Sequence, residues 1–375
     1  MTARRKKQSE PTLTSLHLPI DLVEEILCRI SVKHLIRLCC VCKSWNSLIF
    51  RDSELAKKHL RKSMSTSSHD RHHLILTPNS PSPDFLLFHS PISSIFTSAT
   101  TTVKHFHYSI TETLNQGRYG NRVSTCDGIV CFKMDNSSVV LCNPFIRKFK
   151  ILPPLKYPDQ SYFEIYYTLV HDCFINNYKI IAVNSTRNSK IKVNVHILGT
   201  NYWRRIQDFP GTDLILVSRL GTFVNHSLNW LVYTAAPFIV SLDLEKESYQ
   251  KLALPVFDDF TSFFTIGTLR DCLSLLFYRW VEFCDVWIMK EYGNEKSWTK
   301  FLTVPHMNEC HFYGYTKALY ISEDDKVLME CTKMGINSLV VYDSINNNFK
   351  IPKFQYDNEG DMTSEVYVES LVSPC

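Results

Sequence analysis

The feature that most constrains the fold of this chain is a repeated pair of short β-rich runs in its long C-terminal part. Each pair has an apolar run, a tight polar turn and a second run that ends in an aromatic residue or leucine. Three pairs share turn residues one hundred positions apart, at Asn143, Asp243 and Asp343. They read VVLCNPFIRKFKILP, IVSLDLEKESYQKLALP and LVVYDSINNNFKIPKF. The pattern predicts β-hairpins, because strand-length runs alternate with turn residues and no helical period appears.

Three further pairs extend the repeat to six. They turn near His89, Gly199 and Lys290, so successive turns lie 44 to 56 residues apart. A β-rich period near 50 is typical of a kelch-like propeller, in which each four-stranded blade buries its faces against its neighbours. We therefore predict six blades, with the first strand, HHLILT, and the last, EVYVESLV, sharing a blade. A β-sandwich or split barrel with accidental spacing is the alternative, and a count of only 11 glycines is unlike an ordinary kelch array.

The N-terminal part of the chain has a helical period instead. From Leu18 the run LPIDLVEEILCRI places apolar residues on one helix face, and Pro19 suits its first turn. Ser31 is positioned to cap a second helix, a third contains Trp45, and RDSELAKKHLRK forms a fourth. The chain is thus expected to be an α+β multidomain protein, with a small all-α bundle followed by an all-β propeller. The predicted parts are a disordered basic tail (1–14), the helices (15–62), a polar linker (63–71) and the propeller (72–372).

The predicted helical bundle has more apolar positions than a unit of its size can bury. Units of about 40 residues rarely fold alone without a disulfide, a metal or a partner. Some apolar surface of these helices must therefore contact something else. The helices either dock on the β domain or bind a separate protein, and the periodicity alone leaves both open.

The charge of the chain is unevenly distributed. Residues 1–71 contain 14 Lys+Arg and 7 Asp+Glu, whereas the rest contains 27 and 30. This distribution argues against nucleic-acid binding by the large domain and favours an acidic protein partner for the small one. The basic run from Arg4 to Lys7 is either a nuclear-import signal or a solvated tail.

Two compositional features bear on location and metal binding. No apolar stretch approaches the roughly 18 residues of a membrane span, so no membrane contact and a cytoplasmic or nuclear location are expected. The thirteen cysteines fall mostly in apolar runs, so disulfides are not expected. His69, His72 and His73 lack a flanking carboxylate or cysteine pattern, and they indicate a loop before a strand rather than a metal site.

The helical segment closely resembles the F-box, the motif by which substrate receptors bind the Skp adaptor of cullin-based ubiquitin ligases. The resemblance rests on Leu18-Pro19, Glu25-Ile26-Leu27, Leu35 and the string from Val41 to Trp45. Ser31 stands where plant members usually have proline, and serine caps a helix as well as proline starts one. The resemblance implies that the adaptor contacts Leu18, Pro19, Leu22, Ile26, Leu27, Leu35, Leu38, Val41, Cys42 and Trp45.

The β segment resembles the F-box-associated interaction domain of the plant family that includes the S-locus F-box proteins. The resemblance rests on the run from Cys126 to Cys131, on Asn143-Pro144, on Leu152-Pro153-Pro154 and on further matches up to Leu371. Together with the F-box it covers the chain from about Leu18 to Val372. Trp203, Trp230 and Trp298 are expected to pack between blades rather than stack on a ligand.

An enzymatic function has no support in the sequence motifs. GxSxG, phosphate-loop, GxGxxG and HExxH patterns are absent, so we nominate no catalytic residue, metal ligand or cofactor. The resemblance implies a non-catalytic adaptor that binds Skp, and through it the cullin, and presents an unknown target protein for ubiquitination and proteasomal degradation. Two alternatives remain open: a propeller enzyme or small-molecule receptor, and a Skp-bound scaffold without degradation.

Overall fold

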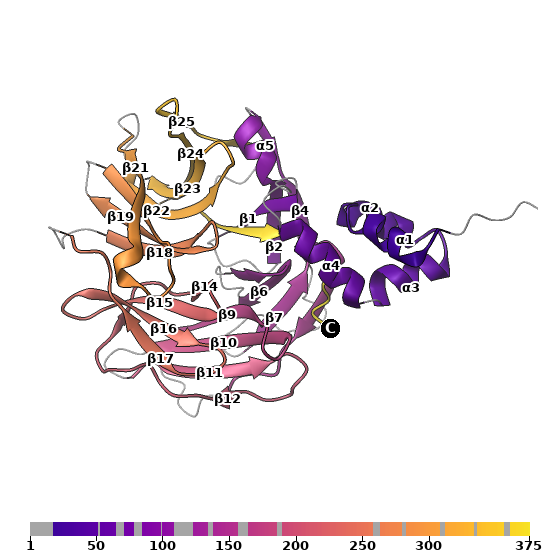
Figure 1. Ribbon diagram of the computed structural model, residues 1–375, viewed down its shortest axis with the longest axis horizontal. Coiled ribbons are helices and arrows are strands. Elements are labelled where there is room, and N and C mark those ends of the chain that lie inside the picture. Colours follow the sequence, from indigo (N-terminus) through magenta and orange to yellow (C-terminus); the bar gives the residue numbers. More distant parts are fainter. Residues whose placement is uncertain are drawn as a thin grey trace, which may run out of the picture.

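The computed structural model consists of a small helical domain attached to one side of a ring of β-sheets (Figure 1). This architecture confirms the predicted order of a helical bundle followed by a six-bladed propeller. The structure describes residues 18–51, 53–64, 71–78, 85–98, 100–108, 123–133, 138–156, 164–185, 190–257, 263–279, 283–307, 312–333, 336–355 and 361–375.

The helical domain contains the four predicted helices. They are α1 (Ile20–Leu27), α2 (Val32–Leu38), α3 (Lys43–Arg51) and α4 (Ser53–Met64). Pro19 precedes α1, where a residue without an amide hydrogen is tolerated. Ser31 lies at the N-cap of α2 as predicted, but its hydroxyl bonds to Nδ1 of His34 (2.7 Å) instead of a backbone amide. The basic tail (1–14) and most of the predicted linker (63–71) lie outside the described residues.

Each blade of the ring is an antiparallel sheet whose first strand lines the central channel. Blade 4 has a divided first strand, because both β13 and β14 pair with β15. The strands of blades 1 to 3 are β27 (Met362–Val368), β1 (His72–Pro78), β2 (Phe85–Pro91) and β4 (Lys104–Tyr108); β5 (Val123–Cys126), β6 (Ile129–Lys133), β7 (Val139–Asn143) and β8 (Lys148–Ile151); and β9 (Glu164–Asp172), β10 (Asn177–Ser185), β11 (Lys192–Ile197) and β12 (Arg204–Arg205). Those of blades 4 to 6 are β13 (Ile215–Leu216), β14 (Thr222–Val224), β15 (Ser227–Tyr233), β16 (Pro237–Asp243) and β17 (Tyr249–Leu252); β18 (Phe263–Leu269), β19 (Cys272–Arg279), β20 (Phe283–Met289) and β21 (Trp298–Pro305); and β22 (Phe312–Ile321), β23 (Lys326–Lys333), β24 (Ile336–Asp343) and β25 (Asn348–Lys350).

The ring is closed by the two ends of the β segment, as predicted. Strand β27 pairs with β1 in antiparallel register over seven residue pairs. Side chains of blade 6 strengthen this closure. The carboxylate of Glu330 accepts hydrogen bonds from the backbone N–H of Ser364 (3.1 Å) and from its hydroxyl, and Lys317 pairs with Glu365. Blade 6 is therefore joined to the last strand of the chain by a polar network that is buried at Glu330 and Ser364.

Five of the six predicted turns connect the third and fourth strands of a blade. In blades 2, 4 and 6 the residue that ends the third strand is Asn143, Asp243 or Asp343. Its side-chain oxygen accepts a hydrogen bond from the backbone amide two residues later, at 3.0, 2.9 and 3.1 Å respectively. This local bond explains why the three positions share a short polar residue.

The sixth predicted turn, near His89, is wrong. Strand β2 continues to Pro91, and a short helix, α5 (Ile92–Thr97), follows where a second strand was expected. Ile92 and Ile95 lie three residues apart and are both buried, so the segment ISSIF buries one helix face. The next strand, β3 (Thr100–Thr102), pairs in parallel with β26 (Lys353–Gln355) outside the six blades.

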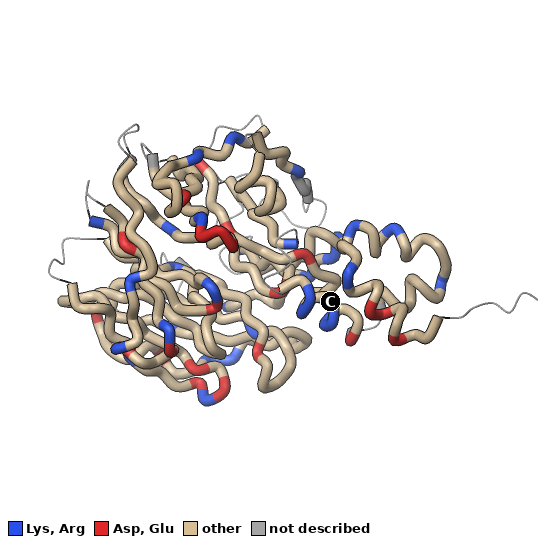
Figure 2. Tube along the Cα trace, turned by 45° about the horizontal axis from the view of Figure 1, so that its top comes forward, with Lys and Arg blue, Asp and Glu red and all other residues tan. Residues whose placement is uncertain are grey.

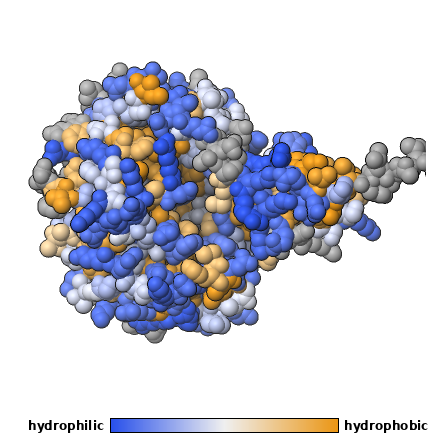
Figure 3. All heavy atoms as spheres, in the orientation of Figure 1, coloured by the Kyte–Doolittle hydropathy of each residue, from blue (hydrophilic) through white to orange (hydrophobic). Residues whose placement is uncertain are grey.

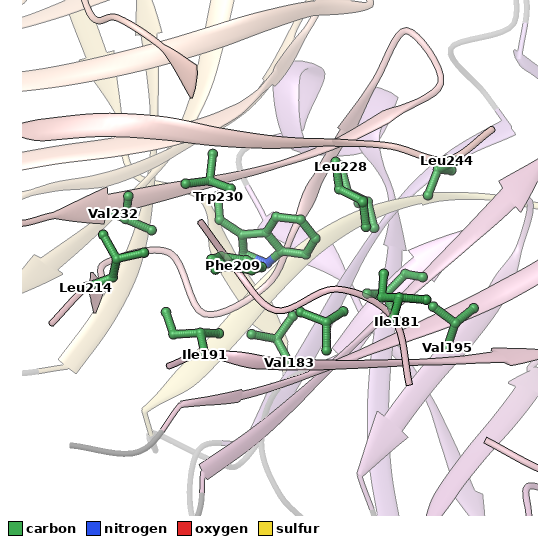
Figure 4. Packing of buried hydrophobic residues seen from close by; sticks show 14 of the residues in the cluster. Ile181, Val183, Ile191, Val195, Phe209, Leu214, Leu228, Trp230, Val232 and Leu244 are labelled. Atoms are coloured by element: carbon green, nitrogen blue, oxygen red, sulfur yellow. The ribbon is translucent and has the colours of Figure 1, made fainter. Parts of the chain in front are cut away.

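Tryptophans join neighbouring blades, as their positions predicted. Trp230 is fully buried between blades 3 and 4, and its ring lies 5.1 Å from that of Phe209 (Figure 4). The indole N–H of Trp203 donates to the carbonyl of Pro153 in the preceding connection (2.8 Å). The indole N–H of Trp298, in blade 5, donates in the same way to the carbonyl of Ala253, which follows the last strand of blade 4 (3.1 Å). The three side chains are therefore part of the framework of the ring.

Candidate protein-binding surface

Helix α1 is apolar on two of its sides. Leu27 is 1% exposed and packs in the core of the helical domain, together with Val32, Leu35 and Ile49. Leu22 and Ile26, one helical turn apart, are each 52% exposed. A helix with both faces apolar has one face left over after the bundle has formed.

Further apolar side chains are exposed next to α1 and at the turn before α3. Leu18 is 61% exposed, Ile20 57% and Val41 69%. With Leu22 and Ile26 they make up what we call the distal apolar surface. Figure 3 shows hydrophobic residues of the helical domain gathered at its end farthest from the propeller. This end of the domain is suited to contact with another protein.

The ten predicted contact residues fall into three groups. Leu18, Pro19, Leu22, Ile26, Val41 and Cys42 are exposed, whereas Leu38 and Trp45 are partly buried against the helical core. Leu27 and Leu35 require a correction, because both face the core and are 1% and 0% exposed. These two leucines stabilise the bundle and do not present a surface to a partner. Ile20 was missed by the sequence analysis, because its spacing from Val23 and Leu27 places it with the inward stripe.

Ion pairs fix α1 against α4 and so orient the exposed face. Lys62 lies 2.6 Å from a carboxylate oxygen of Glu25, which also pairs with Arg29 at 3.0 Å. Lys58 lies 3.7 Å from Glu24. Hydrogen bonds from Lys62 and Arg29 lower the pKa of Glu25 to about 2. Each exposed pair is worth only about 0–1 kcal/mol, so their main effect is on the register of the two helices.

A buried histidine joins the end of α1 to α4. His59 is fully buried, and its Nε2–H donates to the carbonyl of Ile30 (2.9 Å). Burial is the main cause that lowers its pKa to about 4, and the charge of Arg71 acts in the same direction. Arg71 itself donates to the carbonyl of Cys28 (3.0 Å). The last carbonyls of the α1 segment are thus bound by side chains from α4 and from the start of the propeller.

Lowering the pH from 8 to 5 is expected to destabilise the helical domain by about 2 kcal/mol through His59 alone. The pKa of His59 is about 4 in the folded chain, against 6.5 for a free histidine. Between these values only the unfolded chain binds the proton, so stability falls as the pH falls. Hydrogen exchange of the α1 amides, corrected for intrinsic rates, measures the effect. A His59→Gln chain retains a donor and does not titrate, so an equal pH dependence in that variant contradicts the assignment.

The charged residues of the helical domain include a positive excess (Figure 2). Lys33, Arg37 and Lys43 are exposed cations of α2 and α3. Exposed apolar side chains together with cations suit a protein partner that has an apolar groove and acidic residues around it. Within the described parts of the chain, no three His, Cys, Asp or Glu side chains gather in an arrangement that suits a metal ion. None of the described helices has the length and apolar character needed to cross a membrane.

Comparison with known proteins decides the family. A model of the F-box domain matches residues 15–56, and a model of the F-box associated beta propeller domain matches residues 90–374. The chain belongs to the F-box associated β-propeller family. An F-box/kelch-repeat protein of Arabidopsis thaliana is 31% identical over 370 residues, which are 96% of each chain. The F-box protein CPR1 of Arabidopsis thaliana is 24% identical, over 96% of this chain and 89% of that protein.

The F-box therefore contains α1, α2, α3 and the first turn of α4, and the distal apolar surface lies within it. Among solved structures, an oligogalacturonate lyase in complex with manganese is 9% identical with a TM-score of 0.45, covering 77% of this chain and 81% of that chain.

The central channel of the propeller is a second candidate binding site, besides the distal apolar surface. A cavity of about 1540 Å³ runs along the first strands of the blades and reaches α3 and α4. A propeller enzyme or small-molecule receptor predicts convergent titratable groups in such a place. The charged groups at blades 6 and 1, Lys317, Glu365 and Glu330, bond to one another or to backbone across the closure of the ring. The contacts of these three side chains are those of a structural network, while Asp127, His171 and His226 line the cavity at other blades.

Proposed function

We propose that this F-box protein is the substrate receptor of a Skp–cullin–F-box ubiquitin ligase. In this proposal the F-box binds a Skp-type adaptor and through it the cullin, while the propeller binds a target protein that is then ubiquitinated and degraded by the proteasome. The observation that carries the proposal is an exposed apolar surface inside the F-box, formed by residues of the kind and position through which this family contacts the adaptor. The proposed contacts are Leu18, Pro19, Ile20, Leu22, Ile26, Leu38, Val41, Cys42 and Trp45.

The energetics of the distal apolar surface support a partner. Full burial of one Leu, Ile or Val side chain contributes about 1.5–3 kcal/mol, and five such side chains are about half exposed or more in the free chain. Burial of this surface on an adaptor contributes part of the free energy that offsets the loss of translational freedom. The exposed cations Lys33, Arg37 and Lys43 of the helical domain favour an adaptor with an acidic surface.

The proposed role requires no catalytic residue in this chain. Ubiquitin transfer is performed by other subunits, and the receptor raises the effective concentration of a target lysine near the charged enzyme. The described part of the propeller offers exposed apolar side chains for target contact, including Val256 (96% exposed) and Phe263 (60%). We propose the cytoplasm, the nucleus or both as the location of the complex.

Replacement of Leu18 and Pro19 with alanine tests the proposal. The double variant is expected to lose co-purification with a recombinant Skp-type adaptor, because it removes an exposed anchor and the residue that starts α1. Far-ultraviolet circular dichroism of the variant is expected to retain the β signal of the propeller. Val256→Ala, which shortens an exposed apolar side chain of the propeller, is the matched control and should bind normally. Unchanged adaptor binding by the double variant overturns the proposal.

A further inference from the structure

The last seven residues of the chain lie between the two domains. After β27 ends at Val368, residues 369–375 continue without regular structure. Figure 1 shows this C-terminal segment passing close to α4 and ending near the strands of blade 2. The segment contacts the propeller on one side and the F-box on the other, and we call it the C-terminal segment.

Asn143 fixes the C-terminal segment to blade 2. Its side-chain amide nitrogen donates to the carbonyls of Ser370 (3.0 Å) and Val372 (2.8 Å), and its oxygen accepts from the backbone of Phe145. Asn143 is fully buried, so these bonds are shielded from water. The hydroxyl of Ser370 donates to the carbonyl of Asp127.

The backbone of blade 2 also approaches the segment closely. Gly128 has a φ of +76°, and a Cβ atom there would lie 2.5 Å from the Ser370 hydroxyl oxygen and 2.7 Å from the Val368 carbonyl. Only glycine permits both the turn and the close approach. Further along, the thiol of Cys375 donates to the carbonyl of Phe149 (3.3 Å). The segment is therefore held on the propeller at both of its ends.

Leu371 enters the core of the F-box. It is 4% exposed and belongs to the same buried cluster as Leu27, Val32, Leu35 and Ile49. Phe145 and Ile146, from the turn that Asn143 begins, pack against this cluster as well. The hydrophobic core of the F-box is thus completed by side chains from the propeller and from the end of the chain.

The chain passes between the two domains twice, once at the C-terminal segment and once at Arg71, and the two passages lie side by side. Arg71 accepts a hydrogen bond from the backbone N–H of Glu369 (3.0 Å) at its carbonyl, and its guanidinium donates to Cys28 and to Ser63 (3.0 Å each). The Glu369 carboxylate lies 4.0 Å from Nε of Arg71. Two adjacent, bonded crossings restrict rotation between the domains far more than a single linker does.

We propose that the C-terminal segment sets the angle between the distal apolar surface and the propeller, with Leu371 and Asn143 as positioning residues. The inference rests on the proposed function for its consequence: a fixed angle holds the bound target at one place relative to the adaptor. A target lysine is then presented at a high effective concentration instead of being spread over a wide arc.

Small-angle scattering of the free full-length chain tests the inference. The variant with both Leu371→Ala and Asn143→Asp removes the core contact and both donated hydrogen bonds. We expect a broader distribution of distances between the domains and amide exchange in α2 at least about tenfold faster. Asp243→Asn is a substitution between the same two residue types in the equivalent turn of blade 4, away from the C-terminal segment. Leu371→Met conserves the volume of the side chain. Both variants should match the unmodified chain.

The outcomes of this experiment separate the claims. A distance distribution that superimposes on that of the unmodified chain overturns the inference. So does a lower melting temperature of the propeller without any broadening, because that result indicates a purely stabilising role. Equal broadening by Leu371→Met or Asp243→Asn also contradicts it. The measurement does not require an adaptor, so a chain that fails to bind the adaptor contradicts the proposed function and leaves this test valid.

Discussion

Replacement of Leu22 and Ile26 with glutamate is expected to lower the affinity of the chain for a Skp-type adaptor by at least about 100-fold. The two side chains are each 52% exposed on the outer face of α1. The variant loses two apolar contacts, and it must bury two carboxylates against the adaptor. Loss of a contact at the centre of an interface can cost 2 kcal/mol or more, which is about 30-fold in affinity. Isothermal titration with the purified adaptor measures the change.

This prediction has two comparison variants, one on the propeller and one on the inward face of α1. Val256→Glu places the same charge on an exposed propeller residue and should leave the affinity unchanged. Leu27→Glu buries a charge in the core of the F-box, so it should abolish the slow amide exchange of α1 as well as binding. If the Leu22 and Ile26 variant binds as tightly as the unmodified chain, the distal apolar surface is not the adaptor site.

Glu330→Ala is expected to destabilise the propeller by about 3–5 kcal/mol. The Glu330 carboxylate accepts hydrogen bonds from Thr316 (3.1 Å) within blade 6 and from the backbone and hydroxyl of Ser364 in β27. Its loss leaves two buried donors of Ser364 and the partly buried Thr316 hydroxyl without this acceptor, and it removes one connection across the closure of the ring. Urea unfolding followed by tryptophan fluorescence measures the difference, since tryptophans lie between the blades.

Two companion variants make the Glu330 prediction specific. Asp324→Ala removes an exposed carboxylate from the turn that precedes β23 and should change stability by less than about 0.5 kcal/mol. Glu330→Gln keeps the shape and an acceptor oxygen, so it should cost less than the alanine. Equal effects of Glu330→Ala and Asp324→Ala show that the network does not stabilise the closure.

The repeat in the sequence predicted the ring because its signals are local. Asn143, Asp243 and Asp343 each bond to a backbone amide two residues later, so the turn chemistry is visible in any short window. The segment after His89 departs from the hairpin pattern, and local features of the sequence explain this departure too. Pro91 ends the strand, and the isoleucines that follow are spaced for one face of a short helix. Two isoleucines three positions apart are too few to predict a helix from periodicity.

The candidate site was predictable in position but not in orientation. Apolar residues of α1 lie on two sides, and periodicity does not say which side faces the bundle. Leu27 and Leu35 therefore joined the predicted contacts although both are buried. The contribution of Leu371 was beyond the reach of the sequence, because its partners in the F-box core lie more than 300 positions earlier and no local pattern connects them.

The sequence left open whether the helices dock on the β domain or bind a separate protein. The structure shows that these two contacts do not exclude each other. The F-box docks on the propeller through Phe145, Ile146 and Leu371, and it still exposes Leu22 and Ile26 at its far end. The inward side of α1 packs in the core that contacts the propeller, and its outward side stays exposed and available to a partner. A bundle of four short helices has enough apolar surface for both contacts.

The half-life of proteins bound by the propeller tests the central claim most directly. Proteins captured by both the unmodified chain and the Leu22 and Ile26 variant are followed in cells after protein synthesis is stopped. The account predicts that at least one of them decays rapidly with the unmodified chain and persists with the variant, although both chains bind it. Equal half-lives for every captured protein contradict a role in degradation and favour a scaffold instead.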